Sequence, residues 1–160
     1  MALDFGIIGN IFKDSFEDGS VELSAGQRFI PSNQGTTIQE VTYTQHDLPG
    51  PGYIDLTGAS ITLDVVDGQK VFLMATNESD CEATETGATI RFTRGGSQIG
   101  QTRSVDIVDT DSEVNMALQH VDEPGNGTFT YKVQGRAFGV AGRDKNNITA
   151  GVFTAFVFNS

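Results

Sequence analysis

The sequence predicts an all-β domain, a jelly-roll β-sandwich of about 8–10 short antiparallel strands, with a short N-terminal arm or helix before it. Three observations predict this fold. Apolar and polar residues alternate with a period of two from Gln27 onward. Turn signals recur about every 8–12 residues along the same stretch. The 160 residues include 19 glycines and no tryptophan, a composition that suits many turns and short strands.

The first 25 residues follow a different pattern. Phe5, Ile8, Phe12 and Phe16 recur every three or four residues, which is the helical period. Glycines within this stretch weaken a helix by about 1 kcal/mol each relative to alanine. We therefore expect residues 1–25 to form an arm or short helix, and residues 26–160 to form the sandwich domain. The apolar side chains of the arm would pack either on their own domain or on a partner.

The strands of the domain are marked by alternation, and the turns by glycine and proline. The predicted strands are residues 37–44, 60–66, 71–75, 88–94, 97–100, 105–108, 114–118, 128–134 and 152–158. Asp67-Gly68 and Gly95-Gly96 predict two-residue hairpin turns. Residues 47–52 and 122–127 are rich in Pro and Gly and predict loops, and residues 77–87 predict an acidic loop.

Two predicted strands are apolar on both faces. In the last strand, Val152, Thr154, Phe156 and Phe158 would point one way, and Phe153, Ala155 and Val157 the other. Residues 71–75 are apolar at successive positions, so this strand too would have apolar side chains on both faces. One face can enter the core, whereas the second needs a cover on a soluble protein. Two such strands side by side would form a subunit interface between symmetric copies, although a closed barrel that buries both strands internally is the alternative.

No residue pattern predicts catalysis, a cofactor or a metal. His46 and His120 are the two histidines, and no serine lies in a Gly-x-Ser-x-Gly turn. Cys81 lies among acidic residues, which raise the pKa of a thiol and oppose nucleophilic use. The alternating acids of residues 109–113 are the best candidate for Ca²⁺, but they lack the EF-hand spacing, so a solvated acidic turn is the simpler interpretation.

The net charge and the absence of targeting signals indicate which partners and which cellular compartment to expect. A net charge of −11 argues against DNA or RNA as a partner and is typical of a soluble surface. The sequence opens without a positively charged and apolar signal segment, and no apolar run is long enough for a membrane span. We therefore expect synthesis in the cytoplasm, with the single cysteine reduced and no membrane partner.

Three stretches carry a resemblance to a known family: Arg94 to Gly100, Val121 to Gln134, and Asn147 to Phe158. The most specific is DEPGNGTFTY from Asp122, in which Pro124 and the following glycines set a turn while Phe129 and Tyr131 face the core together. Together they resemble the tumour-necrosis-factor/C1q-like jelly rolls of bacteriophage virion proteins. The resemblance covers about residues 58–158 and leaves residues 1–50 out.

The resemblance implies a homotrimer with the last strand near the threefold axis, assembled in the host cytoplasm into the virion. The expected trimer interface comprises Phe72, Met74, Val152, Phe153, Phe156 and Phe158. The expected function is that of a capsid decoration (cement) protein, a structural protein and not an enzyme. Its arm would dock on the major capsid protein or neighbouring virion subunits through Phe5, Ile8, Phe12 and Phe16.

Two other functions stay open. A tail-fibre or head-fibre tip would use exposed loops, such as residues 45–52, 77–87 and 139–147, to contact a host glycan or protein. A glycan hydrolase would need a pair of carboxylates, and nothing in the sequence marks one.

Overall fold

The computed structural model describes residues 21–22, 28–29, 37–48, 50–81, 86–107, 112–139 and 146–159. The chain divides into two compact units, Met1–Thr36 and Thr37–Ser160. In the first unit, β1 (Val21–Glu22) and β2 (Arg28–Phe29) pair antiparallel. The sandwich strands all belong to the second unit. The predicted boundary at residue 25 falls where only these two short strands are described, so it stays a prediction.

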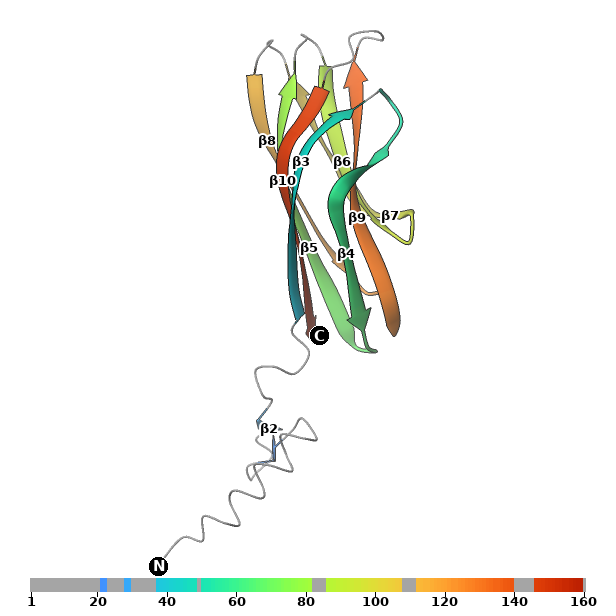
Figure 1. Ribbon diagram of the computed structural model, residues 1–160. Helices are drawn as coiled ribbons and strands as arrows, with labels where there is room; N and C mark the ends of the chain where they lie inside the picture. Colours follow the sequence, from blue (N-terminus) through green and yellow to red (C-terminus); the bar gives the residue numbers. More distant parts are fainter. Residues whose placement is uncertain are drawn as a thin grey trace, which may run out of the picture. The chain divides into compact units, whose positions relative to one another are not determined.

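Eight antiparallel strands form two four-stranded sheets, which face each other as the two layers of a sandwich (Figure 1). The strands are β3 (Thr37–Leu48), β4 (Ile54–Val65), β5 (Gln69–Cys81), β6 (Thr86–Arg94), β7 (Ser97–Ile107), β8 (Ser112–Asp122), β9 (Gly127–Gly139) and β10 (Asn146–Asn159). The order is β3-β10-β5-β8 in one sheet and β4-β9-β6-β7 in the other. The first and last sandwich strands are neighbours, and successive strands mostly change sheets. This is the strand order of a jelly roll, so the predicted fold class is confirmed.

The core lies between the sheets and is filled by every second residue of each strand. In β4, Ile61, Leu63 and Val65 are buried while the residues between them are exposed. Across the sandwich, Phe92 of β6 stacks on Phe153 of β10 with ring centroids 5.6 Å apart. The alternation in the sequence therefore reports directly which face of each strand enters the core.

One of the two predicted hairpin turns, Gly95-Gly96, is confirmed, because β6 and β7 pair on either side of it. Asp67-Gly68 forms a turn but not a hairpin, because β4 and β5 belong to different sheets and do not pair with each other. Asp67 and Gly68 connect β4 to β5, with φ of 83° at Gly68. Gly95 and Gly96 connect β6 to β7 and have φ of 56° and 86°. Two successive residues with positive φ match the type I′ turn that suits the twist of a hairpin.

The acidic loop predicted at residues 77–87 is wrong for most of its length. β5 continues to Cys81 and β6 begins at Thr86. The strand persists because its inward polar side chains find partners: the Tyr43 hydroxyl donates to Asn77 Oδ1, and Ser79 Oγ donates to the Asn147 carbonyl at 3.1 Å. Buried polar groups that are hydrogen-bonded in this way can occupy core positions of a strand.

The jelly-roll topology brings the ends of distant strands together. In one sheet, Asn146 pairs with both Leu48 and Cys81. In the other, Thr86 pairs with both Ile107 and Gly139. The described ends of the stretches 45–52, 77–87 and 139–147 therefore lie at one end of the sandwich, where β3, β5 and β9 end and β6 and β10 begin, at the top of Figure 1.

A polar cluster is buried where β8 turns into β9. Asp122 is 8% exposed and accepts hydrogen bonds from Arg94 Nη1 at 2.7 Å and from the Tyr131 hydroxyl at 2.8 Å. Burial and the neighbouring carboxylate raise the pKa of Tyr131. Phe129 is partly buried against the core beside the fully buried Tyr131, so the two aromatic residues face inward as predicted.

Tyr43 makes stability sensitive to alkaline pH. Burial raises its pKa above the ordinary value near 10, so the folded state resists loss of the proton. Its contribution to stability is complete below pH 10 and declines as the pH rises beyond it. At pH 11 the free energy of unfolding is expected to fall by about 1.4 kcal/mol through Tyr43.

Denaturant melts of wild type and Tyr43→Phe at pH 8 and pH 11 would measure this term. The wild type should lose more stability than the variant between the two pH values. Equal losses in both proteins would contradict the assignment to Tyr43.

Candidate oligomerisation surface

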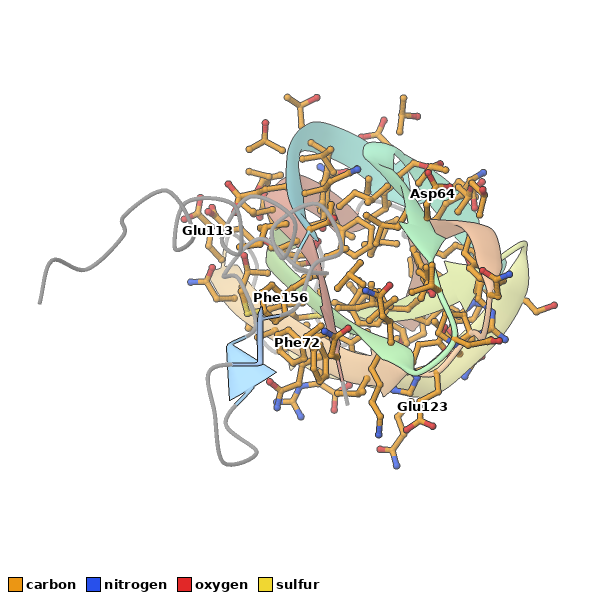
Figure 2. The ribbon with its side chains drawn as sticks, turned by 90° about the horizontal axis from the view of Figure 1, so that it is seen from below. Asp64, Phe72, Glu113, Glu123 and Phe156 are labelled. Atoms are coloured by element: carbon orange, nitrogen blue, oxygen red, sulfur yellow. The ribbon has the colours of Figure 1, made fainter. Side chains whose placement is uncertain are left out.

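An apolar row crosses all four strands on the outward face of the β3-β10-β5-β8 sheet. Phe156 of β10 pairs with Ile38 of β3 on one side and with Phe72 of β5 on the other. Phe72 in turn pairs with Val121 of β8. Paired residues share a face of the sheet, so the four side chains stand in one line. In Figure 2, which is turned by 90° from Figure 1, Phe72 and Phe156 lie side by side.

Two further residues widen the row into a patch. Phe158 stacks on Phe156 with ring centroids 5.7 Å apart, and Met74 follows Phe72 on the same face of β5. Ile38 is 63% exposed, Val121 45% and Met74 40%, while the three phenylalanines shield one another and are half-buried. The apolar patch is defined as Ile38, Phe72, Met74, Val121, Phe156 and Phe158.

Polar contacts border the apolar patch. Lys70, which pairs with Phe158, forms an ion pair with Glu123 at 2.7 Å. Thr154 Oγ1 donates to Glu40 Oε2 at 3.1 Å on the other side. An apolar centre with a polar border is the usual composition of a protein–protein interface. Contiguous exposed apolar residues on a soluble domain mark such an interaction site.

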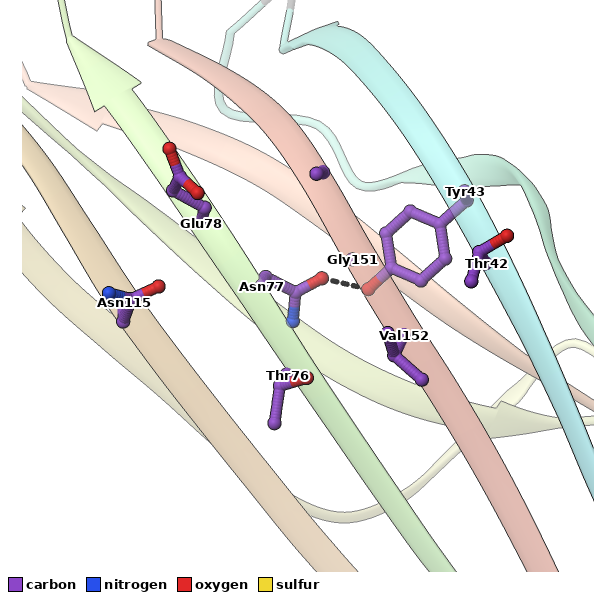
Figure 3. Close-up of a pocket in the computed structure, with 9 residues that line it drawn as sticks. Thr42, Tyr43, Thr76, Asn77, Glu78, Asn115, Gly151 and Val152 are labelled. Carbon is purple, nitrogen blue, oxygen red and sulfur yellow. Dashed lines mark hydrogen bonds between the residues drawn. The ribbon is translucent and has the colours of Figure 1, made fainter.

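The same sheet face carries a groove beyond the apolar patch. The groove has a volume of about 320 Å³ and is lined mainly by Thr42, Thr76, Glu78, Asn115, Ala150 and Val152. At its floor, Tyr43 reaches across β10 at Gly151 to bond Asn77 of β5 (Figure 3). A Cβ atom at Gly151 would overlap the Tyr43 ring, so the glycine makes room for this crossing.

The structure places five of the six predicted interface residues on this outward face. Phe72, Met74, Phe156 and Phe158 belong to the apolar patch, and Val152 lines the groove. β10 and β5 are neighbours, as the pairing of two doubly apolar strands predicted.

Phe153 is a correction: it is fully buried and stacks on Phe92 in the core. Because side chains alternate along a strand, Phe153 and Phe156 point to opposite faces, and both cannot belong to one interface.

Sequence reasoning missed Ile38 and Val121. In the predicted strand 37–44, Ile38 is at an even position and points away from Val41 and Tyr43, and this parity is the signal that could have found it. Val121 was considered only as part of a turn motif. The structure buries Met116, and Val121, five positions further along β8, points to the opposite face.

Other predicted positions are placed as follows. Phe5, Ile8, Phe12 and Phe16 lie outside the described residues, as do residues 109–111 and the side chains of His46 and Cys81. His120 is half-buried, with its ring against Gly100. The described part of the chain holds no group of three or more metal-ligating side chains. Within that part, no helix has the length and apolar character of a membrane span.

Comparisons with known proteins find similarity at the level of structure. The chain matches no protein-family model and no curated protein. A structure of infectious bursal disease virus, Gx strain, is 13% identical with a TM-score of 0.49; the match covers 88% of this chain and 37% of that one. Dimeric latent PorU from Porphyromonas gingivalis is 5% identical with a TM-score of 0.47, over 78% and 13% of the two chains.

A third similar structure is the enzymatically active domain of tailspike protein 4 from bacteriophage CBA120. It is 14% identical with a TM-score of 0.29, and the match covers 79% of this chain and 20% of that one. This chain thus spans well under half the length of each of these structures. The jelly-roll assignment rests on the strand order above, and no function is carried over from the three proteins.

Proposed function

We propose that this protein is a structural virion component, a capsid decoration (cement) protein that trimerises through the apolar patch and stabilises a phage head. The observation that carries the proposal is the apolar row Ile38–Phe156–Phe72–Val121 on the outward face of a jelly roll. Jelly rolls are a common architecture of viral capsid domains. The net charge of −11 suits a protein that must stay soluble at high local concentration before assembly.

A trimer is the symmetry we propose for the apolar patch. A closed ring of copies covers an exposed apolar face without leaving it open to further addition. The choice of three copies comes from the resemblance to tumour-necrosis-factor/C1q-like virion domains, with β10 near the axis. The central place of Phe156 in the patch is in accord with that arrangement.

The N-terminal arm would supply the contact with the major capsid protein or a neighbouring virion subunit. Its candidate anchors are Phe5, Ile8, Phe12 and Phe16. Deletion of residues 1–20 is expected to abolish binding to capsids while the trimer stays folded, because the sandwich strands begin at Thr37. Co-sedimentation of the truncated and full chains with empty capsids measures this. Full binding by the truncated chain would rule out docking through the arm.

A receptor-binding tip of a head or tail fibre is the second candidate. The observation that favours it is that the described ends of the stretches 45–52, 77–87 and 139–147 lie at one end of the sandwich. Copy number separates the two functions. Quantitative mass spectrometry of particles is expected to find this chain in numbers comparable with the major capsid protein. A few copies per particle would favour the tip, and absence from the particle would contradict both.

The proposal gives the chain no catalytic role. It places the protein in the virion after assembly in the host cytoplasm. Turnover of a glycan by the purified protein would contradict a purely structural role.

A further inference from the structure

A cluster of two arginines and one tyrosine lies on the other sheet, on its outward face. Arg91 of β6 lies over the ring of Tyr53, with its guanidinium carbon 3.7 Å from the ring centroid. The guanidinium carbon of Arg136 from β9 is 4.9 Å from the same centroid. Tyr53 directly precedes β4, so the cluster joins three segments that are distant in the sequence.

Hydrogen bonds hold two members of the cluster in place. The Gly50 carbonyl accepts from the Ala137 amide at 3.0 Å, which ties the segment before Tyr53 to β9. Arg91 donates from Nε to Gln134 at 2.8 Å and from Nη1 to Gln98 at 3.1 Å. A guanidinium that stacks by its face and is fixed on one edge keeps its remaining N–H groups for an acceptor.

Both positive charges lack an anionic partner among the described residues. The ion pairs found there use Lys70, Arg94 and Lys132, and neither Arg91 nor Arg136 takes part in one. The nearby carboxylate of Asp55 is engaged by Lys132 at 2.6 Å and by Gln134 at 2.7 Å, contacts that lower its pKa.

The Arg136 guanidinium has an unmet donor as well. Its Nε is buried without an acceptor in the described part of the chain. In a protein with 21 acidic and 10 basic residues, two arginines that stack on one ring and form no ion pair with a described residue make a cationic site.

We propose that Tyr53, Arg91 and Arg136 bind the carboxylate of an acidic saccharide. The planar fork of arginine matches a carboxylate and can donate two parallel hydrogen bonds to it. The side chains around the cluster are polar, namely Asp55, Gln98, Lys132 and Gln134. These polar surroundings suit a polyhydroxylated anion better than a protein partner, whose contact would be centred on apolar residues.

The site is compatible with the proposed oligomer but does not depend on it. It lies on the β4-β9-β6-β7 sheet, and the apolar patch lies on the opposite layer of the sandwich. Copies that associate through the apolar patch would therefore leave the arginine cluster open to solvent. A saccharide bound there would add a contact with a host or capsular surface to the structural role.

Calorimetric titration of the full chain with tetragalacturonate tests the proposal, with neutral maltotetraose and a pentaglutamate peptide as companion probes. The wild type is expected to bind tetragalacturonate and neither companion. Arg136→Gln and Arg91→Gln should each weaken binding about tenfold or more. Arg136→Lys, which keeps the charge but loses the fork, should weaken it too.

Arg103→Gln on β7 is the matched control, because it removes one exposed positive charge outside the cluster. It should bind like the wild type, and thermal melts should show that each variant is folded. Absence of binding to tetragalacturonate would overturn the proposal. Equal binding of pentaglutamate would overturn the saccharide assignment, and equal weakening by Arg103→Gln would reduce the effect to general charge attraction.

Discussion

Replacement of Phe156 by Asp is expected to convert the oligomer into folded monomers. Phe156 occupies the centre of the apolar row, between Ile38 and Phe72. A carboxylate at that point would be buried without a partner in the assembled state, at a cost of about 3 kcal/mol or more for each copy. That corresponds to a loss of more than about a hundredfold in the association constant. The monomer should keep its fold, because the Phe156 side chain points away from the core.

Light scattering on a sizing column would measure the mass of the variant, and circular dichroism its fold. Val66→Asp is the matched control, since Val66 is 56% exposed but lies in the turn between β4 and β5 and is not a member of the apolar patch. The control should keep the mass of the wild type. A Phe156→Asp protein with the wild-type mass would show that the apolar patch is not the interface.

Gly151→Ala is expected to reduce the free energy of unfolding by about 3 kcal/mol. The added Cβ would overlap the ring of Tyr43, which passes β10 at this glycine. Tyr43 cannot move away freely, because its hydroxyl bonds the buried Asn77 on the next strand. Either the ring or the backbone of β10 must shift, and both disturb a packed core.

Denaturant melts compare this variant with Gly52→Ala, whose Cβ would meet open space at an ordinary backbone conformation. The Gly52 variant should be as stable as the wild type or slightly more stable. In a Tyr43→Ala background the cost of Gly151→Ala should largely disappear, since the overlapping ring is gone. A cost that persists in that background would mean that the effect does not come from Tyr43.

Much of the fold could be predicted from the sequence because it depends on patterns within short stretches of the chain. The alternation in residues 60–66 and 128–134, and the turns at Gly68 and at Gly95-Gly96, depend only on neighbouring residues. The two-sided apolar character of β5 and β10 was visible for the same reason. The strand at 77–81 was not predicted, because Asn77 and Ser79 tolerate burial only through partners from distant strands.

The residues that make up the surface sites depend on the pairing register between strands, which cannot be predicted from the sequence. Ile38, Phe72, Val121 and Phe156 become one row only when four strands pair at the observed positions. The cluster of Tyr53 with two arginines likewise needs the segment before β4 to fold back onto β9. Such contacts join residues far apart in the chain, and a pattern within one strand carries no information about them.

The mass of the purified full chain in solution decides whether the apolar patch joins three copies. Light scattering on a sizing column is expected to give three times the mass of the 17.1 kDa chain. A trimer would agree with association through the apolar patch. A chain that stays monomeric at high protein concentration would contradict association through the apolar patch. The apolar row would then remain exposed to water with no copy to cover it.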